Sequence, residues 1–356
     1  MQRTHDLRVE STMPLATPDD IKRELPITEI AAQAVASGRA AIEAIFHGRD
    51  ARLLVIVGPC SIHDPEAALD YARRLRAVSD RYADSLLICM RGYFEKPRTN
   101  VGWKGLINDP HLDGSCDVGL GLRIARRLLL ALAELGLPIA NEALDPVTPQ
   151  YLADLIAWSA IGARTTESQT HREMASGLSM PVGFKNGTDG ELEIAINAMR
   201  AASTAHSFIG IDGAGRVSVV RTLGNPFCHV VLRGGQRGPN YGEAAVRAAT
   251  DRLAQAGLPR RVVVDCSHDN SLRDAANQPS VAQTVGAQVA RGNFDIMGVM
   301  MESHLVAGRQ QLVPGQPLVY GLSITDACID FATTEQVIAG LAEASRERAA
   351  YGERRD

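Results

Sequence analysis

The sequence of 356 residues contains no long apolar run and no excess of charge of either sign. No stretch approaches the ~20 consecutive apolar residues of a membrane-spanning helix, and the first twenty residues mix polar and charged side chains. The formal net charge is −4, which argues against nucleic acid or an anionic membrane as the main partner. We therefore expect a cytoplasmic protein with no nucleic-acid and no membrane partner, in which any basic site is local.

Cysteines are few, and repeats and low-complexity segments are absent from the sequence. The six cysteines show no paired spacing, which argues against a disulfide framework, so we expect most of them to be buried thiols. With 45% hydrophobic residues the chain is long enough for one large domain or two smaller ones.

Residues 1–26 read as an arm in which Thr17-Pro18 begins a short helix and Pro26 ends it. A longer amphipathic helix is predicted over residues 28–47, with Gly48 as its stop signal. Its candidate core positions are Ile30, Ala34, Ala41, Ile42 and Ile45.

From Arg52 onward the pattern changes to short apolar runs separated by helical segments, which is typical of parallel strands buried on both faces. Helices are predicted to begin at Asp64-Pro65 and Thr148-Pro149. Further helices are predicted over residues 118–136, 191–201, 242–257 and 279–292. The predicted strands are 53–57, 86–90, 138–140, 159–163, 181–184, 229–232, 261–264 and 296–301.

Eight βα units in about 300 residues match a (β/α)₈ TIM barrel. The interval between Lys185 and His229 is too long for a simple crossover and contains two β-like runs around Gly213-Ala-Gly215. We therefore predict an inserted β-hairpin at about 205–224. The expected organisation is an N-terminal arm and helix over residues 1–48 and a catalytic barrel over residues 49–356.

Barrel enzymes carry their chemistry where the strands end, and reactive groups follow the predicted strands here. A cationic set suits a small, multiply charged anion, such as a phosphate that also bears a carboxylate, because Arg supplies bidentate forks and Lys a point charge. This set consists of Arg91, Lys96, Arg164, Lys185 and Arg233.

A second set of groups combines soft, borderline and hard ligands, which suits a divalent transition metal better than Mg²⁺ or Ca²⁺. It consists of Cys60, His268, Glu302 and Asp326. His63 and His111 are close to strand ends but not on them, and we interpret both as loop histidines.

These motifs resemble those of the type I class of 3-deoxy-D-arabino-heptulosonate 7-phosphate (DAHP) synthases, the enzymes that open the shikimate pathway. The resemblance extends from about Asp6 to about Ala344. It rests on Gly58-Pro-Cys-Ser-Ile-His-Asp64, the stretch from Arg91 to Gly105, Ile161-Gly-Ala-Arg-Thr-Thr-Glu-Ser168, Pro181-Val-Gly-Phe-Lys-Asn-Gly-Thr-Asp189, Leu232-Arg-Gly-Gly235, Asp265-Cys-Ser-His268, Met301-Glu-Ser303 and Ser323-Ile-Thr-Asp-Ala-Cys328.

The resemblance implies a metal-dependent condensation of phosphoenolpyruvate with erythrose 4-phosphate. The cationic set would bind phosphoenolpyruvate, whereas Pro97, Arg98 and Thr99 would contact the aldose phosphate. Cys60, His268, Glu302 and Asp326 would hold Mn²⁺, Fe²⁺, Co²⁺ or Zn²⁺. From their positions, we expect Glu142 to orient the attacking water and Lys96 to donate a proton, so that the expected catalytic residues are Lys96, His268, Cys60 and Glu142.

The resemblance also implies feedback inhibition by an aromatic amino acid in a homodimer or homotetramer. Tyrosine is favoured, because in related enzymes a serine at the position of Gly210 goes with phenylalanine and a glycine with tyrosine, in keeping with the room that a phenolic hydroxyl needs. The corresponding regulatory residues are Asp6, Pro149, Gln150, Leu178, Ser179, Phe208, Gly210 and Val220.

Three alternatives remain open at this point. Another phosphoenolpyruvate-condensing enzyme, such as 3-deoxy-D-manno-octulosonate 8-phosphate synthase, would share half of the site. A Schiff-base aldolase would need a lysine of depressed pKa in a pocket less suited to anions. A non-catalytic barrel that only senses an aromatic amino acid would have no use for the intact metal and cation sets.

Overall fold

The structure is a computed structural model that describes residues 4–98, 102–313 and 315–353. The N-terminal arm leads into helix α1 (Pro18–Glu24), where the Thr17 hydroxyl accepts a hydrogen bond from the Asp20 N–H and Pro18 occupies the first turn. Helix α2 (Glu29–Phe46) begins after Thr28, whose side chain caps it in the same way. Both predicted helices are therefore confirmed.

The buried stripe of α2 differs from the prediction at its start. Ile30 is 65% exposed, whereas the buried side chains include Ala31, Val35 and Ile42. This stripe follows the i, i+4, i+7 spacing of a helix face, and Ile30 lies one position away from it. Assigning Ile30 to the core was wrong, because hydrophobicity alone does not set the rotation of a helix against its neighbours.

Eight parallel strands close into a barrel, as predicted. The barrel closes at β1, which pairs with both β2 and β10. The strand residues are almost all buried, as expected for a parallel sheet covered by helices. In order around the barrel the strands are β1 (Leu53–Gly58), β10 (Ile296–Glu302), β9 (Val262–Asp265), β8 (Cys228–Leu232), β5 (Val182–Lys185), β4 (Trp158–Ile161), β3 (Ile139–Glu142) and β2 (Leu86–Arg91).

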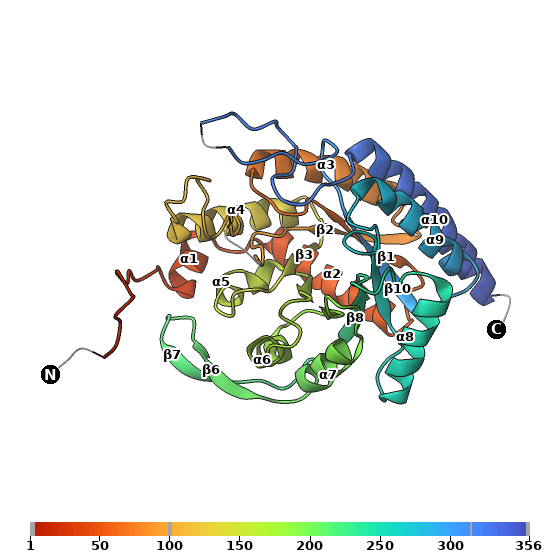
Figure 1. The fold of residues 1–356 in the computed structure, drawn as a ribbon, viewed down its shortest axis with the longest axis horizontal. Helices are drawn as coiled ribbons and strands as arrows, with labels where there is room; N and C mark the ends of the chain where they lie inside the picture. The colour runs from red at the N-terminus through yellow and green to blue at the C-terminus, as the bar shows by residue number, and fades with distance from the viewer. Residues whose placement is uncertain (1–3, 99–101, 314, 354–356) are drawn as a thin grey trace.

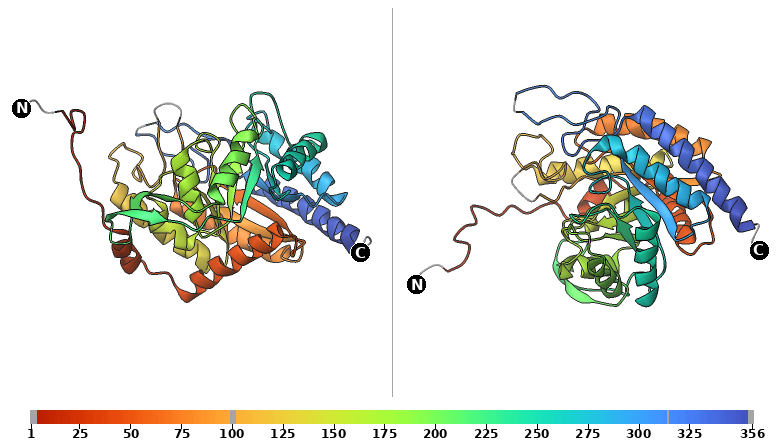
Figure 2. Two further views of the ribbon diagram at one scale, coloured as in Figure 1. Left: turned by 90° about the horizontal axis from the view of Figure 1, so that it is seen from below. Right: turned by 45° about the vertical axis from the view of Figure 1, so that its right-hand side comes forward.

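Helices surround the barrel, and the last two lie side by side along one flank (Figures 1 and 2). The helix predicted to begin at Thr148-Pro149 is only the short α5 (Pro149–Leu152), followed by the 3₁₀ turn η1 (Ala153–Leu155). Two helices were not predicted, α6 (Gln169–Gly177) and α10 (Phe331–Glu353). The remaining helical elements are α3 (Pro65–Arg81), α4 (Val118–Glu134), α7 (Glu193–Ala202), α8 (Glu243–Gln255), η2 (Ala275–Asn277) and α9 (Gln278–Ala290).

The fourth strand of the barrel ends two residues earlier than predicted. Strand β4 stops at Ile161, because the carbonyl of Gly162 accepts hydrogen bonds from the N–H groups of Thr165 and Thr166 and the chain turns. Arg164 therefore lies on this turn above the barrel and not on the strand end itself.

The predicted hairpin is present as β6 (Ser207–Ile211) and β7 (Val217–Arg221), outside the barrel sheet. Its turn contacts the first turn of α1, since the Asp19 N–H donates to the Gly213 carbonyl at 2.9 Å, and the ribbon views show the hairpin beside α1 (Figures 1 and 2). The outer face of the hairpin exposes Ile209 and Val219 at 81% and 68%.

Five of the six cysteines are buried and Cys116 is exposed; all six are free thiols, as expected. Among the described residues, the helices are all too short or too polar to cross a membrane.

Candidate active site

The strand ends open into a pocket of about 440 Å³. The pocket brings together most of the residues that the sequence assigned to the anion set and the metal set. Cys60 and Arg91 lie beneath it, 0% and 1% exposed, and Thr99 lies outside the described residues. The predicted site residues that line the pocket are Lys96, Pro97, Arg98, Glu142, Arg164, Lys185, Arg233, His268, Glu302 and Asp326.

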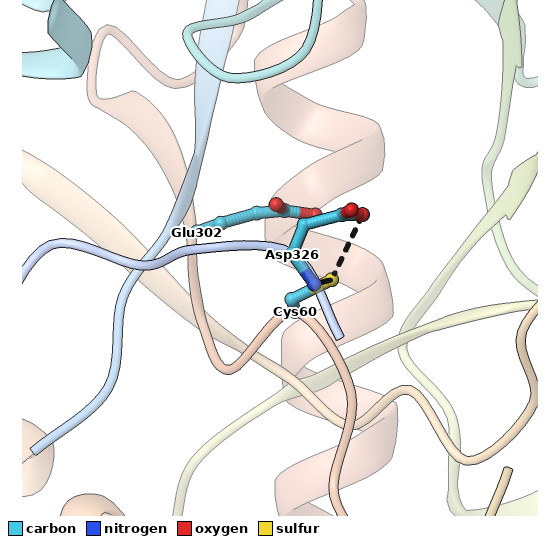
Figure 3. Close-up of side chains that lie close together, drawn as sticks. All are labelled: Cys60, Glu302 and Asp326. Carbon is cyan, nitrogen blue, oxygen red and sulfur yellow. Dashed lines mark hydrogen bonds between the residues drawn. The ribbon is translucent and has the colours of Figure 1, made fainter. Parts of the chain in front are cut away.

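A thiol and two carboxylates form a compact group in the pocket. One ligand atom from each of Cys60, Glu302 and Asp326 lies within 4.8 Å of the others, and Figure 3 shows the three side chains turned toward one another. The Cys60 thiol donates to Asp326 Oδ2 at 3.3 Å. The three residues come from the loop after β1, the end of β10 and the loop before α10, so barrel closure brings them together.

His268 extends this group. Its Nε2 is 3.9 Å from Glu302 Oε1, while its Nδ1 lies 2.9 Å from Asp265 Oδ2. The backbone of His268 is left-handed, with φ of 58°, a conformation that non-glycine residues adopt mainly where the surroundings enforce it. The structure therefore places three of the predicted metal ligands in one compact group, with the His268 Nε2 beside it at Glu302 but outside the 4.8 Å limit that the other three share.

The Lys96 ammonium connects the thiol to the carboxylates. Lys96 Nζ donates to Cys60 Sγ at 3.0 Å and lies 3.8 Å from Asp326 Oδ2. Burial, together with Glu302, raises the pKa of the Cys60 thiol to about 12, and Lys96 opposes this shift. For Lys96, burial alone would lower the pKa, but Cys60 and Glu302 raise it on balance. The pKa values of both groups are thus raised above their usual values.

The deeper cations each pair with a carboxylate of the barrel. Lys185 Nζ lies 3.0 Å from Asp265 Oδ2, and Arg233 Nη1 lies 2.5 Å from Asp269 Oδ2. Burial would raise the pKa of Asp265, but His268 and Lys185 hold it well below its usual range. These pairs explain how a folded barrel accommodates buried cations before any anion binds.

Arg91 is similarly held under the pocket floor. Its Nη2 donates to Glu302 Oε1 at 3.1 Å, and its guanidinium lies 3.9 Å from the centroid of the Tyr93 ring. Arg91 is therefore held below the pocket by Glu302. Arg164 is exposed, and within the described residues its one hydrogen bond goes to the Pro97 carbonyl at 3.2 Å.

Glu142 presents a buried oxygen without a hydrogen-bond partner in the described structure, Oε1. The side chain is 8% exposed and lines the pocket. A Cβ at Gly162 would lie 2.3 Å from this oxygen, so the glycine makes the space that Glu142 occupies. An acceptor of this kind in a polar pocket is suited to hold a water molecule.

Several residues of the site were not assigned a role from the sequence. Asp265 was noted as part of the motif Asp265-Cys-Ser-His268 but not as the partner of Lys185 and His268. Asp269 lies on a loop, where no periodicity marks it. Gln278 begins α9 and exchanges two hydrogen bonds with the backbone of Glu302, at 2.8 and 2.9 Å. Arg273 and Arg309 also line the pocket.

The predicted regulatory residues lie away from this pocket. Phe208, Gly210 and Val220 share the half-buried face of the hairpin, and a Cβ at Gly210 would lie 2.8 Å from Val220 Cγ2. Pro149 and Gln150 begin α5, and Leu178 and Ser179 follow α6. Asp6 is on the arm, which extends away from its own barrel in both figures (Figures 1 and 2).

Comparison with known proteins agrees with this geometry. A model of the DAHP synthetase I family matches residues 24–339. The chain belongs to this family. It is 56% identical over 335 residues to the Tyr-sensitive phospho-2-dehydro-3-deoxyheptonate aldolase of Salmonella typhimurium, covering 94% of each chain. It is 53% identical over 343 residues to the Phe-sensitive enzyme of Escherichia coli, covering 96% of this chain and 98% of the relative.

A solved structure of a DAHP synthetase I relative shows the same fold. The phospho-2-dehydro-3-deoxyheptonate aldolase of Francisella tularensis superposes with a TM-score of 0.94 at 45% sequence identity, covering 96% of this chain and 99% of that one. The predicted barrel and the predicted family are thus both confirmed.

Proposed function

We propose that this chain is a DAHP synthase that condenses phosphoenolpyruvate with erythrose 4-phosphate and water to give DAHP and phosphate, the first step of the shikimate pathway. Membership of the family supports the reaction class. The observation that carries the proposal is the meeting of cations for two phosphorylated substrates with a thiol–carboxylate–imidazole group in one pocket.

The first task of the site is to bring two anionic substrates together against their Coulomb repulsion. Arg91, Lys96, Arg164, Lys185 and Arg233 form the phosphoenolpyruvate end in this proposal, and Pro97, Arg98 and Thr99 contact the aldose phosphate. The cations are pre-positioned by Asp265, Asp269 and Glu302, so they need not reorganise when substrate arrives.

The donor set fits a divalent transition metal. Cys60, His268, Glu302 and Asp326 would hold it, and their mix of thiolate, imidazole and carboxylate is compatible with Mn²⁺, Fe²⁺, Co²⁺ or Zn²⁺. When bound, such an ion supplies Lewis acidity toward an aldehyde oxygen. The Cys60 thiol must lose its proton to become a ligand, and the Lys96 ammonium at 3.0 Å favours the thiolate.

In the proposed reaction, C3 of phosphoenolpyruvate forms a bond to the aldehyde carbon while water adds at C2. Phosphate then leaves from the tetrahedral centre at C2, which becomes the ketone of the product. Glu142 holds the attacking water through its unpartnered oxygen, and Lys96 donates the proton that the new hydroxyl requires. The neighbouring carboxylates keep Lys96 protonated for this step.

Regulation by an aromatic amino acid, with tyrosine favoured, completes the proposal. The relatives include Tyr-sensitive and Phe-sensitive enzymes, and the glycine at position 210 leaves no side chain beside Val220 that would compete with a phenolic hydroxyl. The exposed apolar face of the hairpin and the extended arm that carries Asp6 support contacts between subunits of a homodimer or homotetramer.

The test is an assay of phosphoenolpyruvate loss and phosphate release with erythrose 4-phosphate and with arabinose 5-phosphate as competing acceptors. We expect turnover with the four-carbon acceptor. Preference for the five-carbon acceptor would overturn the assignment in favour of the octulosonate class. Trapping of a substrate–lysine adduct by borohydride would instead indicate a Schiff-base aldolase, and binding of aromatic amino acids without any turnover would indicate a sensor.

A further inference from the structure

Two arginines of the pocket belong to neither of the sets described above, Arg273 and Arg309. Both are exposed, in contrast to the deep cations Lys185 and Arg233, which are 4% and 6% exposed. The pocket therefore has a second layer of positive charge at its rim, where Arg98 also lies.

Arg273 is held in place at the rim with its charge only partly used. Its Nε donates to Asp269 Oδ1 at 2.7 Å, and the other oxygen of Asp269 accepts from Arg233. The backbone of Arg273 is left-handed, with φ of 61°, and its N–H donates to the His268 carbonyl at 2.8 Å. Its two terminal Nη groups make no hydrogen bond within the described structure, so their N–H groups can donate to an anionic ligand.

Arg309 has fewer side-chain partners than Arg273 among the described residues. The neighbouring backbone is pinned, because Gly308 exchanges two hydrogen bonds with Cys328 and the Gln310 N–H donates to the Ser323 carbonyl. The guanidinium, however, has no hydrogen bond and no ion pair with the described part of the chain. A rigid backbone thus presents an unpaired cation to the pocket.

Arg98, Arg273, Arg309 and Asp326 line the same pocket, and two of these arginines interact with the Asp326 carboxylate. Burial would raise the pKa of Asp326, but Lys96 and His268 lower it, and Arg98 contributes in the same direction. The pKa of Arg273 is raised chiefly by its hydrogen bond to Asp269, with a smaller contribution from Asp326. Arg98 and Arg273 are therefore both within electrostatic range of the carboxylate beside Lys96.

This arrangement separates the two ends of an aldose phosphate. Its aldehyde must reach Lys96 and the thiol–carboxylate group, where the new carbon–carbon bond forms. Its phosphate, at the other end of the carbon chain, must then point outward to the rim, because the deep cations are taken up by phosphoenolpyruvate. Guanidinium forks are well matched to phosphate oxygens.

We propose that Arg273 and Arg309 act with Arg98 as a rim site for the phosphate of the acceptor sugar, and that these two additional arginines determine the requirement for a phosphorylated acceptor. This inference rests on the proposed function for the identity of the acceptor. Asp269 is a positioning residue, since one carboxylate orients both a deep cation and a rim cation.

Equilibrium binding tests the site without depending on turnover. We expect Arg273→Ala and Arg309→Ala each to weaken erythrose 4-phosphate binding about tenfold in calorimetric titrations without phosphoenolpyruvate, the size of one charge-assisted contact. Binding of phosphoenolpyruvate alone should change less than twofold. Arg247→Ala is the matched control, because Arg247 is an exposed arginine on α8 paired with Glu243, outside the pocket, and should behave as wild type.

Kinetics add a second readout through the comparison of erythrose 4-phosphate with unphosphorylated erythrose. The kcat/KM for erythrose 4-phosphate divided by that for erythrose should fall about tenfold in each rim variant. The variant lacks a contact to the phosphate, so removing the phosphate from the substrate costs it less than it costs the wild type. Arg309→Lys, which keeps the charge but loses the fork, should fall between wild type and Arg309→Ala.

The outcomes separate this inference from the proposed function. Wild-type protein that forms DAHP, with rim variants that bind and use erythrose 4-phosphate as wild type does, would overturn the rim site and leave the function intact. Wild-type protein that forms no DAHP would overturn the function, and the titrations would still decide whether Arg273 and Arg309 bind the sugar phosphate. Equal weakening of phosphoenolpyruvate binding would place both arginines in the other subsite and refute the inference.

Discussion

Removing Lys185 should affect both activity and stability, whereas removing Arg164 should affect activity alone. The sequence by itself predicts that either substitution removes a contact to an anion and leaves the fold intact. The structure changes this expectation for Lys185→Ala, because Lys185 is buried against Asp265, whose side chain is 0% exposed. Deleting the lysine leaves a buried carboxylate without its cation.

The size of the effect follows from what remains around Asp265. Loss of one partner of a buried ion pair typically costs about 3–5 kcal/mol. Asp265 keeps the His268 imidazole at 2.9 Å and the Ser267 hydroxyl at 2.6 Å, so we expect the lower end, about 3 kcal/mol. Arg164 is exposed, with a single hydrogen bond to a carbonyl among the residues that the structure describes, and Arg164→Ala should change stability by less than about 0.5 kcal/mol.

Urea unfolding, followed through the fluorescence of the fully buried Trp158, measures this difference. Turnover should fall by orders of magnitude in both variants, since each loses a contact to an anion. A double-mutant cycle with Asp265→Asn should show recovery of part of the stability in Lys185→Ala/Asp265→Asn. The reasoning is refuted if Lys185→Ala unfolds at the wild-type urea midpoint.

The Lys185–Asp265 pair also determines how the stability difference between wild type and Lys185→Ala depends on pH. The pKa of Asp265 is well below its usual range in the folded protein, so its contribution to stability is present above the unfolded pKa, about 3.9, and is lost as pH falls toward the folded value. Lys185→Ala raises the folded pKa of Asp265. The stability gap between wild type and this variant should therefore be largest near neutral pH and narrow in acid.

Three further predictions follow from other parts of the molecule. Chelation should abolish turnover and Mn²⁺ or another transition divalent should restore it, while Cys60→Ala should behave like the stripped protein; full activity without bound metal would remove the metal from the mechanism. Tyrosine should inhibit wild type more strongly than phenylalanine, and Gly210→Ser should weaken this preference, because a Cβ there already meets Val220 at 2.8 Å; insensitivity to phenylalanine, tyrosine and tryptophan alike would exclude the regulatory site. Burial and Asp145 raise the pKa of Glu95 to about 8, so that wild-type stability should decline as pH rises between about 4.5 and 8, when this group is protonated only in the folded state. Glu95→Gln should flatten that decline in pH-dependent urea unfolding, and parallel curves for the two proteins would contradict the assignment.

Much of the barrel is predictable because strand ends and helix starts are local events. The apolar runs and the Asp64-Pro65 signal depend only on residues close in sequence, and the structure confirms them to within a residue or two. Helix α10 was missed because it carries many alanines and no marked apolar stripe, and its place is decided by packing against α9. The exposed position of Ile30 likewise depends on how α2 is rotated against the barrel.

The residue types and their order along the chain determined the family and the (β/α)₈ architecture, and they predicted an anion set and a metal set at the strand ends. Only the tertiary structure decided which group faces which. Arg91 meets Glu302 across 211 positions of sequence, and Cys60 meets Asp326 across 266. Such encounters depend on barrel closure and on the rotamers that buried side chains adopt, which no local pattern encodes. For the same reason, the sequence gives the positions of Arg273 and Arg309 along the chain but does not show that both line the pocket.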